Sequence, residues 1–265
     1  MRLVVTTPLR PSAAEERDAV LAAARYDLPY AARGGRALTR VVAGAGAEAA
    51  LVLSATRAVL VAGGAEHAWS PGMGLLRMKR VLAARASGRP AAPPDRDPFT
   101  EAAGLEPGDR VLDCTAGLGA DALVAAAAVE PRGEVVGLES SRALAAWTGE
   151  GMRRLEHEPA RRVEIRCADH AAFLAGAADG SFDVVVFDPM FRHARAEPGG
   201  FDVVRQLADA RPLAPEALAE ARRVARRWVV VKDGAPGWDL ARLGLVPLPS
   251  ARGAHRYYAR VPAGL

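Results

Sequence analysis

The chain contains few of the residues that would indicate a disulfide scaffold, a zinc site or a membrane protein. Only two of its 265 residues are cysteines, Cys114 and Cys167, and its five histidines are scattered along the sequence. A structural zinc site needs several such ligands at short spacing, so we expect no metal and a reducing compartment. No apolar run approaches the roughly 18 residues of a membrane-spanning helix. Pro8 interrupts the first apolar run before it reaches the length of a signal peptide, so we expect a cytoplasmic protein.

Lysine and aromatic residues are also scarce. Lysine occurs only at Lys79 and Lys232, and aromatic residues make up 5% of the chain, so nearly all the positive charge is arginine. The 35 basic residues against 31 acidic ones give a net charge of +4 and an isoelectric point near 9.5. This balance permits an acidic partner such as RNA but does not require one. Half of the residues are hydrophobic, which indicates a globular protein and excludes a disordered chain.

A proline-rich segment divides the chain. Four prolines lie between Ser87 and Pro98, where they cannot sustain a helix or a central strand. We therefore predict a small α/β N-terminal domain over residues 1–90 and a second domain over residues 91–265. In the first domain we expect a helix over 12–25, capped by Ser12 with Glu15 three residues later, and a basic amphipathic helix over 75–86. The strands expected there span 3–6, 50–53 and 59–62.

The second domain alternates apolar, strand-like runs with helical stretches. This pattern is typical of a doubly wound, mostly parallel sheet. We predict seven strands, over 110–114, 134–138, 163–167, 183–187, 228–232, 243–248 and 255–261. The helices expected between them span 120–129, 141–155, 170–175 and 215–226.

A glycine-containing loop follows the first of these strands. The sequence Asp113-Cys-Thr-Ala-Gly-Leu-Gly-Ala-Asp121 runs directly into a helix, and Gly117 and Gly119 allow a tight turn and the close approach of a ligand. The acidic residues on both sides would repel a pyrophosphate, so the loop favours a cationic, nucleotide-type cofactor. A plain strand-to-helix turn would have the same glycines.

Acidic residues follow the next two strands. Glu139 lies about 20 residues beyond the glycines, where it can accept hydrogen bonds from the hydroxyls of a ribose. Alternatively, its negative charge can stabilise the N-terminus of the next helix. Ser140 or Ser141 would cap that helix. Asp169, beside His170, is a candidate to bind the amino group of an adenine and equally a candidate for an ordinary helix N-cap.

The fourth strand ends in Asp188-Pro-Met-Phe191. At the carboxyl end of a parallel strand, Asp188 and a neighbouring carbonyl can accept hydrogen bonds from a planar exocyclic amine, Pro189 fixes the backbone, and Phe191 can stack on a ring. Such a site would hold an amine in line with an electrophilic methyl group. The alternative is an ordinary turn at the end of a strand.

Three basic clusters are candidates for contact with nucleic acid, although charged runs on helices are usually solvated faces. We expect the first of them to be the best candidate. They comprise Arg77, Lys79 and Arg80; Arg153, Arg154, Arg161 and Arg162; and Arg222, Arg223, Arg226 and Arg227.

Taken together, these motifs resemble the class I S-adenosylmethionine-dependent methyltransferases, and more narrowly the RsmJ-type family, whose characterised members methylate N2 of a guanine in 16S ribosomal RNA. The resemblance covers most of residues 97–261, with Val229-Val-Val-Lys232 as a further matching segment. The segments around Arg10 and Gly72 look more like a branch of uncharacterised methyltransferases from Gram-positive bacteria. Residues 192–200 depart from the basic stretch that the family often has there.

The resemblance implies a Rossmann-like fold, S-adenosylmethionine as the cofactor and ribosomal RNA as the substrate. It places the catalytic residues at Asp188, Pro189 and Phe191. The cofactor-binding residues would be Asp113, Thr115, Gly117, Gly119, Ala120, Asp121, Glu139, Ser140, Asp169 and His170. The alternatives are a methyltransferase for a small-molecule or protein amine, and a non-catalytic nucleotide-binding module or dinucleotide oxidoreductase.

Overall fold

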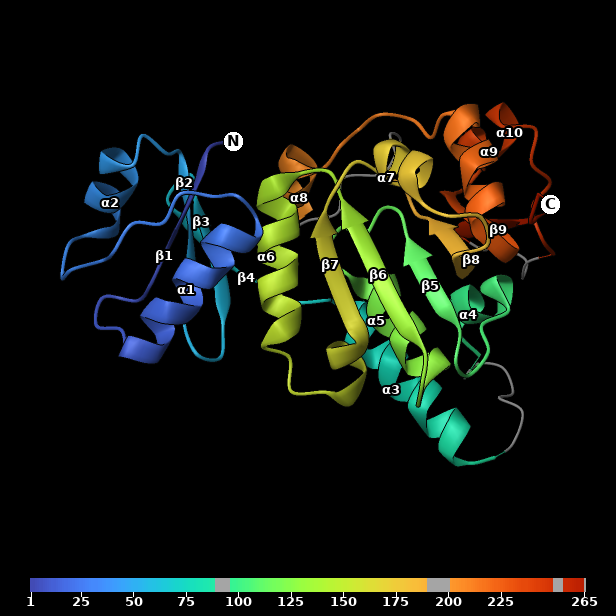
Figure 1. Ribbon diagram of the computed structural model, residues 1–265, viewed down its shortest axis with the longest axis horizontal. Helices are drawn as coiled ribbons and strands as arrows, with labels where there is room; N and C mark the ends of the chain where they lie inside the picture. Colours follow the sequence, from blue (N-terminus) through green and yellow to red (C-terminus); the bar gives the residue numbers. More distant parts are fainter. Residues whose placement is uncertain (89–95, 190–200, 250–254, 265) are drawn as a thin grey trace.

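Two β-sheets form the framework of the molecule, a four-stranded sheet near the N-terminus and a six-stranded sheet after it (Figure 1). The structure is a computed structural model and describes residues 1–88, 96–189, 201–249 and 255–264. In this part of the chain no helix combines the length and the apolarity that a membrane crossing requires.

The first sheet has the order β1-β2-β3-β4, with β1 parallel to β2 and the other pairs antiparallel. Its strands are β1 (Leu3–Thr6), β2 (Ala49–Leu53), β3 (Ala58–Ala62) and β4 (Ala65–Ala68). Helices α1 (Ala13–Arg25) and α2 (Leu38–Gly44) connect β1 to β2. The capping box predicted for α1 is present, because the Ser12 hydroxyl accepts the Glu15 N–H at 3.2 Å and the Glu15 carboxylate accepts the Ser12 N–H at 2.8 Å.

The second sheet has the order β10-β9-β8-β5-β6-β7, in which only β10 is antiparallel to its neighbour. Its strands are β5 (Arg110–Asp113), β6 (Glu134–Glu139), β7 (Val163–Cys167), β8 (Phe182–Phe187), β9 (Ala225–Gly234) and β10 (Arg256–Pro262). The carboxyl ends of the five parallel strands lie at one edge (Figure 1). Cofactor-binding sites of open α/β sheets form at this edge.

The expectation of seven strands is wrong for the described residues, which contain six in this sheet. The segment 243–248 forms no strand. Helix α10 (Trp238–Arg242) ends immediately before it, and Gly244 has a φ of +67°, which breaks an extended backbone. Pro247 lacks the N–H that a sheet requires, so that the contact with β10 is a single hydrogen bond from Leu248 N–H to the Tyr258 carbonyl at 2.7 Å.

Helices cover both faces of the second sheet (Figure 1). Alternate strand residues such as Val111 and Val135 pack against α3 (Met73–Ala86), α4 (Pro98–Ala103) and α5 (Ala120–Val129). The opposite face, with Leu112 and Val136, packs against α7 (His170–Gly176), α9 (Pro215–Val224) and α10. The remaining helices are α6 (Arg142–Arg153), the 3₁₀ helix η1 (Glu158–Arg162) and α8 (Phe201–Leu207).

Helix α3 packs on the second sheet and not on the first. Its main partner is α5, and a side chain at Gly74 would come within 2.8 Å of the Ala120 backbone, so only glycine allows this approach. By packing, α3 is therefore associated with the second sheet, although it precedes the proline-rich segment at which we predict the domain boundary. Prolines mark a break in secondary structure and carry no information about packing.

Helix α6 joins the two units. Tyr26 and Trp69 of the N-terminal unit lie against Gly149 and Gly151 of α6, where any larger residue would collide with their rings. The Trp147 indole N–H donates to the Ala58 carbonyl at 3.3 Å. Together with the hydrophobic residues of α1 and β2, α6 forms one continuous core.

Candidate active site

The loop between β5 and α5 has the tight turn that its glycines predicted. Gly117 and Gly119 both have positive φ angles, +53° and +76°. A β-carbon on Gly119 would lie 2.8 Å from the Met152 methyl group of α6. The Thr148 hydroxyl of the same helix donates to the Gly117 carbonyl at 2.7 Å, so α6 fixes the loop from behind.

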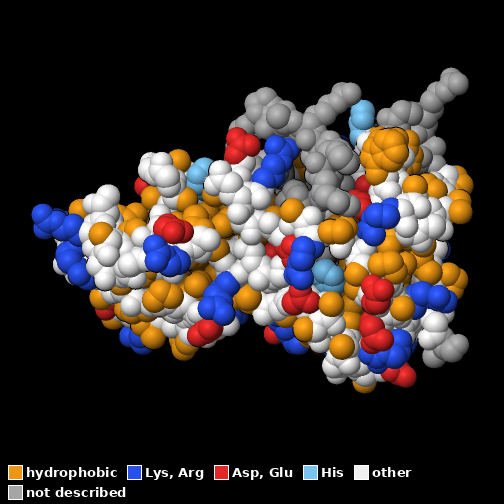
Figure 2. Space-filling model, turned by 90° about the horizontal axis from the view of Figure 1, so that it is seen from above, with side chains coloured by type: hydrophobic (Ala, Val, Ile, Leu, Met, Phe, Trp, Pro, Cys, Tyr) orange, Lys and Arg blue, Asp and Glu red, His pale blue; other side chains and the backbone are white. Residues whose placement is uncertain are grey.

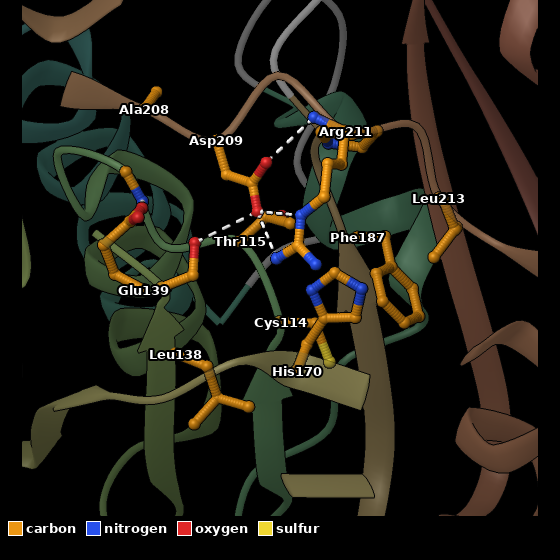
Figure 3. Close-up of a pocket in the computed structure, with 13 residues that line it drawn as sticks. Cys114, Thr115, Leu138, Glu139, His170, Phe187, Ala208, Asp209, Arg211 and Leu213 are labelled. Carbon is orange, nitrogen blue, oxygen red and sulfur yellow. Dashed lines mark hydrogen bonds and ion pairs between the residues drawn. The ribbon is translucent and has the colours of Figure 1, made fainter. Parts of the chain in front are cut away.

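A cleft opens beside this loop, at the carboxyl ends of β5, β6 and β8 (Figure 3). Six of the residues predicted for the site line it, and the remaining lining comes from neighbouring strand ends and from the segment after α8. The predicted residues in the lining are Thr115, Gly117, Glu139, Ser140, His170 and Pro189, and the others are Cys114, Leu138, Phe187, Ala208, Asp209, Arg211 and Leu213. The predicted residues Asp113, Gly119, Ala120, Asp121, Asp169 and Asp188 are not part of this lining.

Glu139 is the buried acid of the cleft. Its carboxylate accepts the Gly117 N–H at 3.2 Å and the Ser141 N–H at 2.8 Å, so it ties the glycine loop to the end of β6. Burial raises the pKa of Glu139, against the effect of these two hydrogen bonds. Ser141, the second of the two candidate serines, caps α6 by accepting the Leu144 N–H at 3.4 Å.

Asp169 caps α7, one of the two roles that the sequence left open. One of its oxygens accepts the N–H groups of Ala171 and Ala172, at 2.9 and 3.1 Å. Its second oxygen accepts a bond from Arg211 at 2.6 Å. His170 turns the edge of its ring toward Phe187, with the ring centroids 5.6 Å apart, and burial lowers its pKa.

Asp209 and Arg211, which the sequence did not indicate, complete this part of the cleft (Figure 3). The Arg211 guanidinium lies 2.5 Å from an Asp209 oxygen and pairs with Asp169 as well, so it connects the start of α7 to the segment after α8. The Ser140 hydroxyl donates to Asp209 at 3.3 Å. These residues follow no motif and belong to a segment in which we expected no element, so only the three-dimensional fold reveals them.

Asp188 lies at the end of β8, beside the cleft. Its backbone N–H donates to the Thr115 hydroxyl at 2.6 Å, which fixes it to the glycine loop. Its side chain is 27% exposed, and one of its oxygens lies 2.5 Å from the Lys232 ammonium of β9. Burial and the nearby Asp121 raise the pKa of Asp188, whereas Lys232 opposes this shift. Phe191, the predicted stacking residue, lies outside the described residues.

Asp121 faces away from the cleft into a chain of buried ion pairs. Its two oxygens lie 2.8 Å from the Lys232 ammonium and 2.5 Å from the Arg77 guanidinium, which also binds Asp97 at 2.7 Å. Burial would raise the pKa of Asp121, but the two cations hold it down, at about 2. The sequence assigned Asp121 to the cofactor, and Arg77 to a surface cluster, because a motif does not show which way a side chain points.

Asp113 lies below the glycine loop. It is 3% exposed, and its carboxylate accepts the Thr115 N–H at 3.0 Å. Burial raises the pKa of Asp113 to about 7, with Asp121 and Asp188 acting in the same direction. This carboxyl group therefore titrates near neutral pH, unlike an ordinary aspartate.

Most arginines of the three predicted basic clusters pair with acids, whereas Lys79, Arg80, Arg153 and Arg222 have no ion pair in the part of the chain that the structure describes. Arg77 is in the buried chain described above, and Arg154 pairs with Glu150 and Asp18. The other pairs are Arg161 and Arg162 with Glu158, Arg223 with Asp179 and Glu220, Arg226 with Asp183, and Arg227 with Glu106 and Asp109. Most of these arginines therefore add little net charge to the surface.

A family model described as "Putative SAM-dependent methyltransferase" matches residues 73–242. The chain belongs to this family, and the protein is therefore an S-adenosylmethionine-dependent methyltransferase that uses S-adenosylmethionine as its cofactor. The matched span begins at α3 and includes the glycine loop, Glu139, Asp188 and Lys232.

Relatives agree with this assignment. The chain is 30% identical over 236 residues to the uncharacterized protein YpiP of Bacillus subtilis, covering 87% of this chain and 88% of that protein. It is 38% identical over 148 residues to ribosomal RNA small subunit methyltransferase J of Laribacter hongkongensis, covering 51% of this chain and 50% of that enzyme. The chain thus spans about half of the length of the named enzyme.

A solved structure has the same fold. It is an S-adenosylmethionine-dependent methyltransferase from Neisseria gonorrhoeae, 20% identical, and it aligns with 98% of this chain and 96% of its own at a TM-score of 0.59. This similarity shows that the chain has the α/β fold of the class I methyltransferases.

Proposed function

We propose that the protein transfers a methyl group from S-adenosylmethionine to an exocyclic base nitrogen of small-subunit ribosomal RNA, with guanine N2 as the target atom. The position of Asp188 carries this proposal. Its carboxylate is partly exposed beside the cofactor cleft, fixed through its backbone by Thr115 and through one oxygen by Lys232. Relatives named ribosomal RNA small subunit methyltransferase J support RNA as the substrate, and a ribosomal substrate would place the protein in the cytoplasm.

The residues of the cleft fit the proposed cofactor. S-adenosylmethionine, when bound, supplies a methyl group on a positively charged sulfur. Glu139 can accept hydrogen bonds from the ribose hydroxyls, and Thr115, Gly117 and Ser140 line the same wall. His170 and Phe187, whose rings are perpendicular to each other, line the cleft with aromatic surface against which an adenine ring can pack.

Asp188 would act on the methyl acceptor. An exocyclic amine has a lone pair delocalised into the ring, and positive charge develops on its nitrogen as the new carbon–nitrogen bond forms. The Asp188 oxygen that Lys232 leaves free can accept an N–H bond from the amine and stabilise this charge. The proton is released afterwards, to water or to Asp188.

Incorporation of a tritiated methyl group tests the proposal. Purified protein, labelled S-adenosylmethionine and small subunits from a strain that lacks the protein should give label in the RNA, and nucleoside mass spectrometry should identify N2-methylguanosine. Asp188→Ala should abolish the transfer and leave the cofactor dissociation constant within a few-fold of wild type. Label in N2-methylguanosine from the Asp188→Ala protein would refute the role of Asp188.

The same cofactor-binding cleft would serve a methyltransferase that acts on a small-molecule or protein amine. The observation that favours this alternative is the pairing of Arg223, Arg226 and Arg227 with acids, which leaves less unpaired positive charge on the protein surface for RNA. Label found only in low-mass extract or in protein, and none in ribosomal RNA, would replace the RNA proposal by this one.

A further inference from the structure

An acid-free stretch of the N-terminal unit has a concentration of positive charge that the cofactor site does not use. Residues 28–47 contain Arg33, Arg36 and Arg40 and no aspartate or glutamate. The stretch comprises most of the connection between α1 and α2, the whole of α2 and the three residues after it. We call Arg33, Arg36 and Arg40 the arginine tip.

The turn that contains the first two arginines is held in one shape by their own side chains. Arg33 Nε donates to the Arg36 carbonyl at 2.8 Å, and Arg36 Nη2 donates to the Ala32 carbonyl at 2.5 Å. Between them Gly34 and Gly35 have φ angles of +50° and +71°, which only glycine adopts without strain. Bonds to carbonyl groups do not neutralise a guanidinium, so the turn presents its charge in a fixed position.

No ion pair involves the arginine tip within residues 1–88, 96–189, 201–249 and 255–264. Arg36 and Arg40 are exposed, and the acids that flank the stretch, Asp27 and Glu48, pair with Arg142 and Arg2. On the second unit Arg161, Arg166 and Arg226 are equally exposed, but each has a carboxylate partner. The arginine tip therefore differs in charge balance from these three arginines.

The position of the arginine tip suits a large partner. Figure 1 shows α2 at the end of the molecule away from the six-stranded sheet, and Figure 2 shows basic side chains at that end of the surface. A small substrate in the cleft cannot reach it. An extended polyanion that enters the cleft with one nucleotide can contact both places.

We propose that the arginine tip binds the phosphate backbone of the RNA substrate, an inference that rests on the proposed function. Guanidinium groups match the geometry of phosphate oxygens, and arginines that lack a carboxylate partner keep their full attraction for them. The N-terminal unit then serves as a docking element that holds the RNA while the target base lies near Asp188.

Salt-dependent binding of RNA tests this directly. The triple variant Arg33→Gln/Arg36→Gln/Arg40→Gln is compared with a control that removes the same charge from paired arginines, Arg161→Gln/Arg166→Gln/Arg226→Gln. The slope of log K against log salt for naked 16S ribosomal RNA should fall by roughly 2 to 3 in the triple variant, because each lost phosphate contact contributes about 0.7 to 0.9, and should change little in the control. Because Arg33 and Arg36 also support the turn, Arg40→Glu alone provides a variant that breaks none of their hydrogen bonds and should lower the affinity several-fold.

Kinetics separate this inference from the proposed function. In the triple variant KM for RNA should rise, with kcat at saturating RNA and the dissociation constant of S-adenosylmethionine unchanged. Equal slopes in the two triple variants, or an Arg40→Glu protein that binds RNA as the wild type does, would overturn the proposal that the arginine tip binds RNA. Neither result would affect the proposal that the protein methylates RNA. A triple variant that loses binding to small subunits but not to naked RNA would also overturn it, since the contact would then be a ribosomal protein. Absence of methyl transfer to RNA by the wild-type protein, with the difference in slope present, would instead refute the proposed function.

Discussion

The ammonium group of Lys232 lies 2.5 Å from an oxygen of Asp188 and so places a buried positive charge beside the carboxylate that we assign to the methyl acceptor. The same ammonium lies 2.8 Å from Asp121, whose other oxygen binds Arg77. Lys232 is therefore held between two carboxylates, and its own pKa is raised by them in spite of burial. This ion pair fixes the orientation of Asp188 and favours its ionised form, against burial and Asp121, which raise its pKa.

Replacing Lys232 by methionine should raise the pKa of Asp188 further, because burial and Asp121 already raise it and Lys232 opposes them more strongly than Arg256 does. Methyl transfer requires the ionised carboxylate, so activity falls as the pH drops through this pKa. The acidic limb of the pH–rate profile should therefore move to higher pH, with kcat at pH 7 reduced by roughly tenfold or more, about 1.4 kcal/mol for each tenfold. Lys232→Arg should restore part of the rate.

Lys79→Met is the matched control for Lys232, since these are the two lysines of the chain and Lys79 is exposed on α3. It should leave the pH profile unchanged. A Lys232→Met enzyme with the wild-type profile and a lower kcat at every pH would show that Lys232 has only a structural role.

Asp113 should make the stability of the protein depend on pH. Its pKa is about 7 in the folded state against 3.8 in the unfolded state, so the folded protein binds this proton more tightly. The free energy of unfolding should therefore decrease by at most about 4 kcal/mol as the pH rises from about 4 to 7, and it should level off above pH 7. Asp113→Asn keeps the acceptor for the Thr115 N–H and should remove this decrease.

Urea denaturation at pH 5 and pH 8 measures the effect. Asp179→Asn, at a side chain that is 75% exposed, serves as the control and should retain the decrease. The same pH dependence in wild type and Asp113→Asn would contradict the assignment of a raised pKa to Asp113.

Local sequence signals predicted the parts of the fold that depend on a few neighbouring residues. Helix α5 begins at Ala120 directly after Gly119, as the glycine loop predicted, and Asp169 caps α7, which is one of the two roles that the sequence left open for it. The strand predicted over 243–248 was wrong because apolar residues alone favoured it, while Gly244 and Pro247 prevent it. The hydrophobic pattern of a segment indicates which of its residues are buried, but a half-buried segment need not join a sheet.

The electrostatics of the site depended on long-range contacts and could not be predicted in the same way. Arg77 reaches Asp121 across 44 positions of sequence, and Arg211 reaches Asp169 across 42. Nothing local distinguishes these arginines from solvated ones. The acids of the glycine loop suggested a site for a cationic cofactor, but the structure shows that Asp121 is already neutralised by two cations.

Arg211 should influence the discrimination between the cofactor and its product. It is a positive charge in the lining of the cleft, and its pairs with Asp169 and Asp209 offset two carboxylates. Arg211→Ala leaves those carboxylates unpaired, which favours a cationic sulfonium over a neutral thioether. The ratio of affinities for S-adenosylmethionine and S-adenosylhomocysteine should rise a few-fold, as measured by titration calorimetry.

Arg211→Lys keeps the charge and should keep the ratio, which distinguishes an electrostatic effect from a loss of packing. Equal changes in the affinities for both ligands in Arg211→Ala would show that Arg211 only closes the cleft.

Glu150 of α6 should be essential for the association of the two units. Its carboxylate is fully buried and accepts bonds from Arg25 of α1 and, at 2.6 Å, from Arg154. Glu150→Ala leaves the Arg154 guanidinium, only 7% exposed, with Asp18 as its remaining acidic partner. Breaking a buried pair in this way costs about 3 to 5 kcal/mol, so the midpoint of urea denaturation should fall sharply.

Asp18→Asn is the control. It removes a partner that is 43% exposed and should cost about 1 kcal/mol or less. Equal losses in the two variants would mean that Glu150 contributes no more than a surface ion pair.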